Sequence, residues 1–593
     1  MALFQSRILR WPLGAAAAAL MAPVVACSNA EPVQSAPTVT AGTVLLAAAE
    51  GDSRSDVSGI ASSSYGDYLA GLIADYRKDV SAAADFMLLT LEGDPDNLRL
   101  LSKTFMLVSA DGRHVEAVRL ARRLVQQTPD HSAANLVLAV DAVERNDVEA
   151  AIGYLEQVPN KGLGTMIRPL IGGWLQMGQD APDQALEELA ELEETGGLSI
   201  LHKMHVALMN DLAGRSEDAE AAFNEAIDPA QRPSLRMAWL AGNFFERQGK
   251  PEAARDLYDR YREGSDETTL FDPAFKRLDD GTVPAPAIAD YTKGVAETLF
   301  NLASLLSQER VEQMALIHVH LALRLDPQFD VARILLGEVL QNQDRGAEAI
   351  AVYRHIGPAS PFSWSARLRI AEELDRIDRT EEAIAELEAL ASERSDDFEA
   401  VFRLGNILRA KERFAEAVSA YDRAFERLSD AEERHWTMYY FRGIALERSG
   451  IWERAEADFL KALELKPEQP YVMNYLAYSW VEKKMNLDRA KEMLVRAVEL
   501  RPNDGFIVDS LGWVYYRLQE YDLAVSYLEQ AVELRPQDPV INDHLGDAYW
   551  QVGRKHEARF QWRRALSLDP EDDLIPKIST KIDEGLIAAP EKI

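Results

Sequence analysis

Few side chains in this sequence have the types and spacing that catalysis or metal binding requires. His202 and His205 are three positions apart, and His318 and His320 are two positions apart. Histidine nitrogens are common zinc ligands, but neither pair carries the H-E-x-x-H pattern. The sequence also has no G-x-x-x-x-G-K-[ST] phosphate loop and no G-x-S-x-G nucleophile elbow. We therefore interpret these histidines as helix-surface or core residues, and we expect no catalytic activity, no cofactor and no bound metal.

The sequence contains one cysteine, Cys27, so neither an intrachain disulfide nor a cysteine-based zinc site can form. Arg7 and Arg10 give a short basic start, and residues 11–26 are mostly apolar and rich in alanine. This is the pattern of a secretory signal, and the apolar stretch is too short for a comfortable membrane span. We therefore expect residues 1–26 to be a signal peptide.

The residues around Cys27 resemble a lipidation signal. Val24-Val25-Ala26-Cys27 looks like the lipobox of bacterial lipoproteins, a family in which the signal is cut before the cysteine and the thiol carries diacylglycerol. The next residue, Ser28, is similar to the pattern for outer-membrane sorting, where aspartate is avoided. The resemblance implies a lipid anchor at Cys27 on the periplasmic side of the outer membrane. The alternatives are an ordinary cleaved signal with an incidental cysteine, or an uncleaved anchor.

The net charge of the chain makes some classes of binding partner unfavourable. Acidic residues outnumber basic ones by 97 to 64, which gives a formal net charge of -33. Nucleic-acid binding needs a basic surface that neutralises phosphates, and a polybasic membrane contact needs clustered lysine and arginine. We therefore expect protein partners and no nucleic acid.

The strongest pattern is a repeat of 34 residues near the C-terminus. Its first copy consists of Leu511, Gly512, Tyr515, Ala524, Leu528, Ala531 and Pro536, and its second of Leu545, Gly546, Tyr549, Ala558, Trp562, Ala565 and Pro570. This length, with Leu-Gly-x-x-Tyr at the start and Pro at the end, resembles the tetratricopeptide repeat, a helix-turn-helix unit. Small residues allow two helices to cross closely, and proline ends the second helix.

The repeats predict an all-α fold, a right-handed superhelical solenoid of tetratricopeptide repeats in two segments. After a flexible tether at 27–58, which is rich in Ala, Ser, Thr, Pro and Gly, we expect degenerate repeats over 59–263. Residues 264–290 contain several Pro and Gly breakers and predict an interruption that is either a hinge or a plain insertion loop. Regular repeats follow over 291–572, and 573–593 suit a capping helix and tail.

The resemblance to tetratricopeptide repeats also implies a binding surface, because the first helices of such repeats line a concave groove. At the corresponding positions the sequence has large aromatic residues beside Asp and Asn, which suit a bound peptide. The predicted groove consists of Asn406, Tyr440, Tyr471, Asn474, Tyr478, Asp509, Trp513, Tyr516, Asp543, Asp547 and Trp550. The alternative is that several of these side chains pack between neighbouring repeats.

A second candidate surface is basic. Lys555, Arg559 and Arg563 are four positions apart on one helical face, with Arg564 alongside. In so acidic a chain, this cluster would make the local electrostatic potential positive, which suits an acidic partner. The alternative is an ordinary solvated helix face.

One part of the chain resembles a narrower group. DSLGWVYYRL at 509–518 and INDHLGDAYWQVGRKHEARFQWRRAL at 541–566 look like a proteobacterial group of tetratricopeptide lipoproteins. The resemblance is strong over about residues 470–570 and elsewhere covers mainly the layout. It implies a non-catalytic adaptor that recruits or activates a periplasmic carboxyl-terminal processing protease, which degrades cell-wall hydrolases. The alternative is a scaffold for assembly or export of outer-membrane proteins or polysaccharide.

Overall fold

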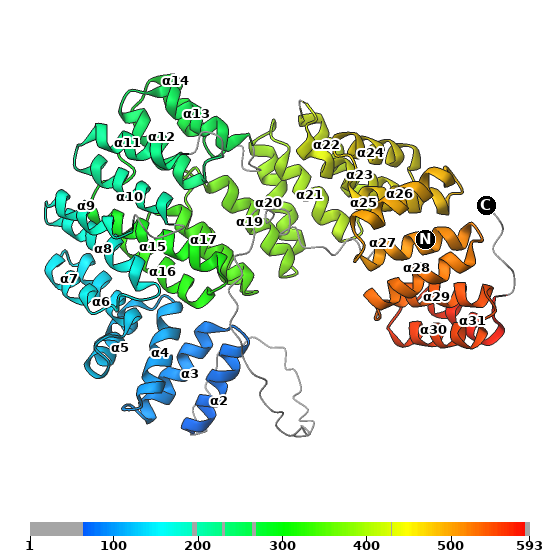
Figure 1. Ribbon diagram of the computed structural model, residues 1–593, viewed down its shortest axis with the longest axis horizontal. Helices are drawn as coiled ribbons and strands as arrows, with labels where there is room; N and C mark the ends of the chain where they lie inside the picture. Colours follow the sequence, from blue (N-terminus) through cyan, green and yellow to red (C-terminus); the bar gives the residue numbers. More distant parts are fainter. Residues whose placement is uncertain (1–62, 193–197, 228–231, 264–268, 429, 587–593) are drawn as a thin grey trace. The chain divides into compact units, whose positions relative to one another are not determined.

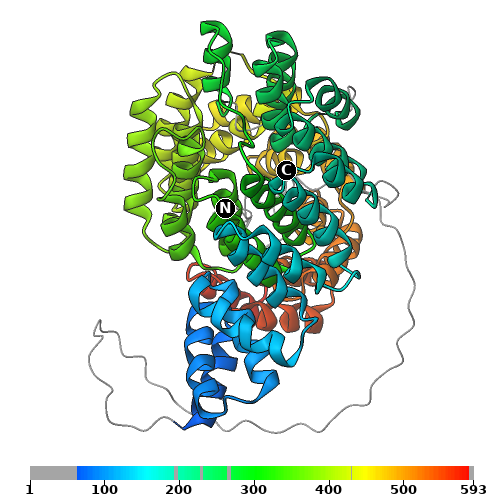
Figure 2. The same ribbon diagram turned by 90° about the vertical axis from the view of Figure 1, so that its left-hand side faces the viewer.

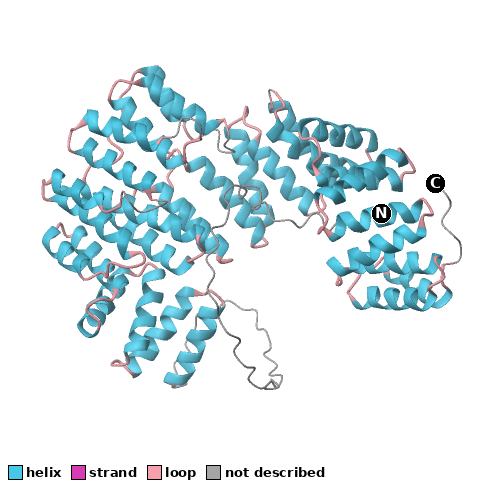
Figure 3. Cartoon of the chain, viewed as in Figure 1, coloured by secondary structure: helices cyan, strands magenta, loops and turns pink. Residues whose placement is uncertain are grey.

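The computed structural model describes residues 63–192, 198–227, 232–263, 269–428 and 430–586. Over these residues the chain forms 30 α-helices and one short 3₁₀ helix, and they include no strand (Figure 3). The predicted all-α fold is confirmed. None of the described helices combines the length and the apolar character needed to cross a bilayer. The expected signal peptide, the expected lipidation site Cys27 and the expected tether lie outside the described residues.

The basic unit is a pair of antiparallel helices that cross at a small residue. In the last pair, a Cβ atom on Gly546 would overlap the indole of Trp562, which is fully buried. Gly405 has the same relation to the buried ring of Tyr421. A small residue on the first helix therefore makes room for a large side chain on the second, as the sequence repeat predicts.

The chain divides into two compact units. Of the described residues, those from 63 to 386 form the N-terminal unit and those from 387 to 586 form the C-terminal unit, so the division falls inside α20 (Thr380–Glu393). The sequence predicted that two superhelical segments would separate at 264–290. The described residues of that stretch pack within the N-terminal unit, and a division of the superhelix at 264–290 stays a prediction.

The N-terminal unit contains the following helices, seen in Figure 1 from blue to green. They are α2 Ser64–Tyr76, α3 Val80–Gly93, α4 Leu98–Ala110, α5 His114–Gln127, α6 Ser132–Glu144, α7 Val148–Glu156, α8 Gly164–Gly178, α9 Pro182–Ala190, α10 Ser199–Leu212, α11 Ser216–Ala226, α12 Leu235–Arg247, α13 Pro251–Arg262, α14 Asp272–Asp280, α15 Tyr291–Gln308, α16 Glu312–Leu325, α17 Asp330–Asn342, α18 Gly346–Tyr353 and α19 Ser363–Arg376.

The pair α15–α16 packs against the first helices of earlier pairs. Besides its own neighbours, α16 contacts α4 and α6, and α15 contacts α8 (Figures 1 and 2). Gly294 of α15 lies against the buried indole of Trp174 on α8. Arg236 of α12 donates from Nε to both carboxylate oxygens of the fully buried Glu297, at 3.0 and 2.9 Å. The chain therefore covers the first-helix face of its own N-terminal repeats.

The interruption expected at 264–290 is anchored where it is described. Phe271 stacks on Tyr258 with ring centroids 4.5 Å apart. The side chain of Asn243 donates to the carbonyl of Ala285 at 2.9 Å and accepts from the amide of Ala287 at 3.1 Å. These contacts fasten the segment to α12 and α13. The expected hinge stays a hypothesis, and the contacts favour a packed insertion.

The C-terminal unit continues with helix pairs in regular order, from yellow-green to red in Figure 1. Its helices are α21 Glu399–Ala410, α22 Phe414–Arg427, η1 Glu433–His435, α23 Trp436–Arg448, α24 Trp452–Leu465, α25 Pro470–Glu482, α26 Leu487–Leu500, α27 Gly505–Arg517, α28 Tyr521–Leu534, α29 Pro539–Gln551, α30 Lys555–Ser567 and α31 Ile575–Glu584. The final helix, α31, lies where the sequence predicts a cap and packs on α30.

The covered face of the N-terminal unit gives a first prediction. Gly294→Ala should destabilise this unit by about 1–3 kcal/mol, because the new methyl group overlaps the buried ring of Trp174. Gly153→Ala is the matched control, since Gly153 is an exposed helical glycine with no atom within 4 Å of an added Cβ. It should stabilise its helix by up to about 1 kcal/mol. Urea unfolding followed by circular dichroism measures both changes, and equal effects of the two variants would contradict the packing of α15 on α8.

Candidate partner-binding site

The predicted groove residues all lie on the first helices of successive pairs in the C-terminal unit. Asn406 is on α21, Tyr440 on α23, Tyr471, Asn474 and Tyr478 on α25, Asp509, Trp513 and Tyr516 on α27, and Asp543, Asp547 and Trp550 on α29. The repeat register therefore brings them onto one series of helices. These helices contact their own partner helices and the neighbouring pairs of the same unit. Helices α4, α6 and α8 are contacted by the distant pair α15–α16. In the described part of the C-terminal unit, no distant helix pair packs in this way on the first helices.

Burial divides these side chains into two groups. Three of them, Tyr471, Trp513 and Trp550, are half-buried. The other eight are buried: Asn406, Tyr440, Asn474, Tyr478, Asp509, Tyr516, Asp543 and Asp547. Asn406, for example, accepts a hydrogen bond of 2.8 Å from the hydroxyl of Tyr421 on the paired helix. The buried group packs between helices, and its role in binding stays a prediction.

Trp513 is the best-held ring of the surface group. It stacks on His544 with centroids 4.1 Å apart and on Tyr516 with centroids 4.8 Å apart. Its indole nitrogen donates to Glu482 Oε1 at 2.9 Å, and Arg517 donates to the same oxygen at 2.8 Å. The ring is therefore fixed in position before any partner binds, which lowers the entropy cost of binding.

His544 of this stack also forms a buried pair with Asp509. His544 Nδ1 is 3.0 Å from Asp509 Oδ1, and both side chains are buried. Burial would lower the pKa of His544, but the carboxylates of Asp509, Asp543 and Asp547 outweigh it and the pKa is raised. Burial also raises the pKa of Asp509, against the effect of His544. The pair is a polar support for Trp513 rather than an exposed reactive group.

One lysine of the last helix, α31, joins it to α29 of the preceding helix pair. Lys581 of α31 donates from Nζ to Asp543 Oδ2 and to Asp547 Oδ2, each at 2.8 Å. Asp547 also accepts from the indole nitrogen of Trp562 at 2.9 Å. Burial raises the pKa of Asp547 to about 6 even though Lys581 lowers it. Sequence reasoning missed Lys581, because its two partners are 34 and 38 positions away.

The four residues of the predicted basic patch fall into two groups, exposed side chains and side chains that bond to the backbone of neighbouring segments. Lys555 and Arg563 are exposed. Arg559 donates to the carbonyl of Ile582 at 3.0 Å, and Arg564 donates to the carbonyl of Pro536 at 2.9 Å. Two of the four cations therefore hold the repeats together, and two remain at the surface as candidates for an acidic partner.

The histidine pairs singled out in the sequence belong mainly to the core of the N-terminal unit. His205 and His318 are fully buried. The indole of Trp174 donates to His205 Nδ1 at 3.0 Å, and His318 Nδ1 lies 2.8 Å from the carbonyl of Met314. Burial lowers the pKa of His205 to about 3 and that of His318 to about 4. These two side chains are therefore neutral packing groups near neutral pH.

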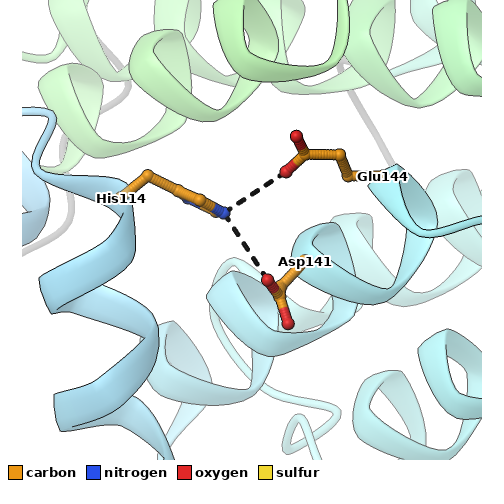
Figure 4. Close-up of side chains that lie close together, drawn as sticks. All are labelled: His114, Asp141 and Glu144. Atoms are coloured by element: carbon orange, nitrogen blue, oxygen red, sulfur yellow. Dashed lines mark ion pairs between the residues drawn. The ribbon is translucent and has the colours of Figure 1, made fainter.

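A further polar cluster in the N-terminal unit has ligand-like geometry. Figure 4 shows His114 of α5 facing Asp141 and Glu144 of α6, with Nε2 3.8 Å from Asp141 Oδ1 and 3.6 Å from Glu144 Oε2. Arg324 of α16 pairs with Glu144 at 2.6 Å, and Arg122 pairs with Asp141 at 3.1 Å. Because guanidinium groups already neutralise both carboxylates, a divalent cation would meet a positive surrounding. We interpret the cluster as a group of ion pairs that joins α16 to helices α5 and α6.

Comparison with known families supports the repeat assignment. Models of the tetratricopeptide repeat match residues 212–268, 368–424, 422–470, 509–538 and 541–572. These matches fall in both compact units. No curated protein matches the chain.

Several solved structures are similar to the chain. The crystal structure of the APC/C hetero-tetramer Cut9-Hcn1 has 15% identity and a TM-score of 0.37, covering 89% of this chain and 97% of that one. Yeast Tom70 has 15% identity and a TM-score of 0.32, covering 88% of this chain and 95% of that one. A thermophilic TPR protein of Thermus thermophilus, TTC0263, has 24% identity and a TM-score of 0.27, covering 31% of this chain and 97% of that one.

The cap gives a second prediction. Lys581→Ala should destabilise the C-terminal unit by about 3–5 kcal/mol, because it leaves two buried carboxylates without their cation. Lys577→Ala on the same helix is the control, since Lys577 is exposed and makes only an i,i+4 pair with Asp573. That change should cost less than about 0.5 kcal/mol. Thermal unfolding compares the two, and similar melting temperatures would contradict the role of Lys581.

The buried histidines give a third prediction. His205 and His318 have folded-state pKa values of about 3 and about 4, below the ordinary 6.5. The unfolded chain therefore binds protons first, and stability is lost as the pH falls below about 6.5. At pH 5 each histidine should cost roughly 2 kcal/mol. Urea unfolding of His318→Gln at pH 7.5 and pH 5 should show a smaller loss than the unmodified chain, and parallel losses would show that His318 does not contribute.

Proposed function

Since this chain is a tetratricopeptide-repeat protein, we propose that it is a non-catalytic scaffold that binds another polypeptide on the first helices of its C-terminal unit. One observation carries the proposal. The half-buried ring of Trp513 is held rigidly by His544, Tyr516 and Glu482, on helices that no inserted pair covers within the described part of the unit. Aromatic rings that are fixed before binding are typical centres of protein interfaces.

The N-terminal unit supports this choice of site. Its equivalent helices α4, α6 and α8 are contacted by α15 and α16, so the chain itself occupies that face. Fully buried contacts such as Trp174 against Gly294 would have to break before a partner could enter. A partner therefore binds at lower cost on the C-terminal unit, where Tyr471, Trp513 and Trp550 are already partly exposed.

We further propose the location and the class of partner. Lipidation at Cys27 would hold the scaffold on the periplasmic side of the bacterial outer membrane, as the lipobox resemblance implies. The narrower resemblance over about residues 470–570 covers α25, α27 and α29, the helices that carry Tyr471, Trp513 and Trp550. One member of the lipoprotein group that this segment resembles is an adaptor that activates a periplasmic carboxyl-terminal processing protease. We therefore assign this chain a partner of that class. The protease would supply the chemistry.

The fourth prediction tests the binding face. Trp513→Ala should weaken capture of the partner by about 30-fold, the loss of a typical interface hot spot of about 2 kcal/mol. Phe560→Ala is the matched control, because Phe560 is exposed on α30, away from the first helices. Affinity purification from membranes identifies the partner, and a titration with the purified partner gives the dissociation constants.

Several outcomes of this experiment would contradict the proposal. Unchanged binding by Trp513→Ala, with the circular dichroism melting curve also unchanged, would move the site away from α27. Recovery of a β-barrel protein or a polysaccharide synthase in place of a protease would replace the assigned partner with an assembly or export machine. Neither result would affect the fold.

A further inference from the structure

The first described helix, α2, exposes five of its six large apolar side chains, and the sixth, Leu72, is half-buried. Tyr65, Leu69, Ile73 and Tyr76 are 84, 58, 54 and 90% exposed. The small residues Gly71 and Ala74 and the carboxylate of Asp67 are the buried ones of this helix. In an ordinary surface helix the large apolar side chains would face the core. This reversed pattern implies that the outer face of α2 is covered in the working protein.

The apolar stripe is a local concentration. Five of the fifteen exposed large apolar side chains in the described part of the chain belong to α2: Tyr65, Tyr68, Leu69, Ile73 and Tyr76. The opposite end of the array is closed differently, since α31 exposes one such side chain, Ile575. A solenoid end is normally capped by a polar outer face. Of the first and last described helices, α31 follows that rule and α2 departs from it.

We propose that the outer face of α2 contacts the lipid surface to which the chain is anchored. The inference rests on the proposed lipidation of Cys27. Ser63, the N-cap of α2, is 36 positions after Cys27. Thirty-six residues reach at most about 130 Å, so the anchor keeps α2 within reach of the bilayer and raises its effective concentration there.

The chemistry of the stripe fits a lipid interface. Tyrosine prefers the headgroup region, where its ring is buried and its hydroxyl stays hydrated. Leu69 and Ile73 lie between Tyr65 and Tyr76 along the helix and would insert most deeply. The exposed Arg77 follows directly after the helix and can reach lipid phosphates. The contact is apolar and does not depend on a basic surface, which agrees with the acidic balance of the chain.

A second copy of the chain fits this face less well. A helix of 13 residues is about 20 Å long, so two such helices face to face bury less than the roughly 1,200 Å² of a stable interface. Of the described helices, α2 packs mainly on α3, and the stripe lies on this single helix. A flat lipid surface requires neither a large complementary partner nor a groove.

The test uses the mature chain from Cys27 with Cys27→Ser, so that no acyl chain contributes to binding. Flotation with vesicles of phosphatidylcholine and phosphatidylethanolamine measures the bound fraction. The Cys27→Ser chain should bind measurably, and adding Leu69→Gln with Ile73→Gln should weaken binding at least tenfold without adding charge. Phe560→Gln, at a residue that is 63% exposed on α30, is the matched control and should bind as before.

Equal flotation with and without the Leu69→Gln and Ile73→Gln changes would overturn the proposal, and so would absence of flotation by the Cys27→Ser chain. Light scattering that shows a dimer abolished by the same two changes would assign the face to a second copy instead. Circular dichroism checks that all variants are folded. Incorporation of labelled palmitate at Cys27 in cells and capture of the partner are separate readouts, so failure of the proposed function is distinguishable from failure of the lipid contact.

Discussion

The structure depends on one recurring contact, the close crossing of two helices at a glycine or alanine. At Gly546 and Gly405 the absence of a Cβ lets a large ring from the second helix fill the space against the first. The same contact recurs between distant parts of the chain, where Gly294 of α15 receives Trp174 of α8. Because protein cores are close-packed, adding a single methyl group at such a crossing would disturb the packing of both helices of the pair. Packing of this kind makes a stable array out of helices that could not be stable alone.

This one contact is used for different purposes in the two units. In the N-terminal unit it joins α15 to α8, and α16 packs beside it on α4 and α6, so the chain covers these first helices itself. In the described part of the C-terminal unit it operates only between neighbours, and Trp513 stays partly at the surface. Self-covering and partner binding are therefore alternative uses of the same set of helix positions. We propose that the C-terminal unit uses them for partner binding.

Much of the fold could be predicted from the sequence, because the 34-residue repeat fixes both the helix pairs and their crossing residues. The capping helix was also predicted, and α31 lies at Ile575–Glu584. The docking of α15 on α8 could not be predicted, because Gly294 and Trp174 are 120 positions apart and no local pattern joins them. The sequence predicted which helices carry the proposed groove residues, but it did not predict which of these side chains are exposed. Whether Tyr440 or Trp513 reaches the surface depends on the neighbouring pair, which sequence periodicity does not specify.

The most direct test of the account is hydrogen exchange by mass spectrometry on the full chain, alone and with its bound partner. We predict that the partner slows exchange in α25 and α27 and leaves α4, α6 and α8 unchanged, since those helices are already covered by α15 and α16. Slowed exchange in α4, α6 and α8 on binding, with α25 and α27 unchanged, would contradict the account.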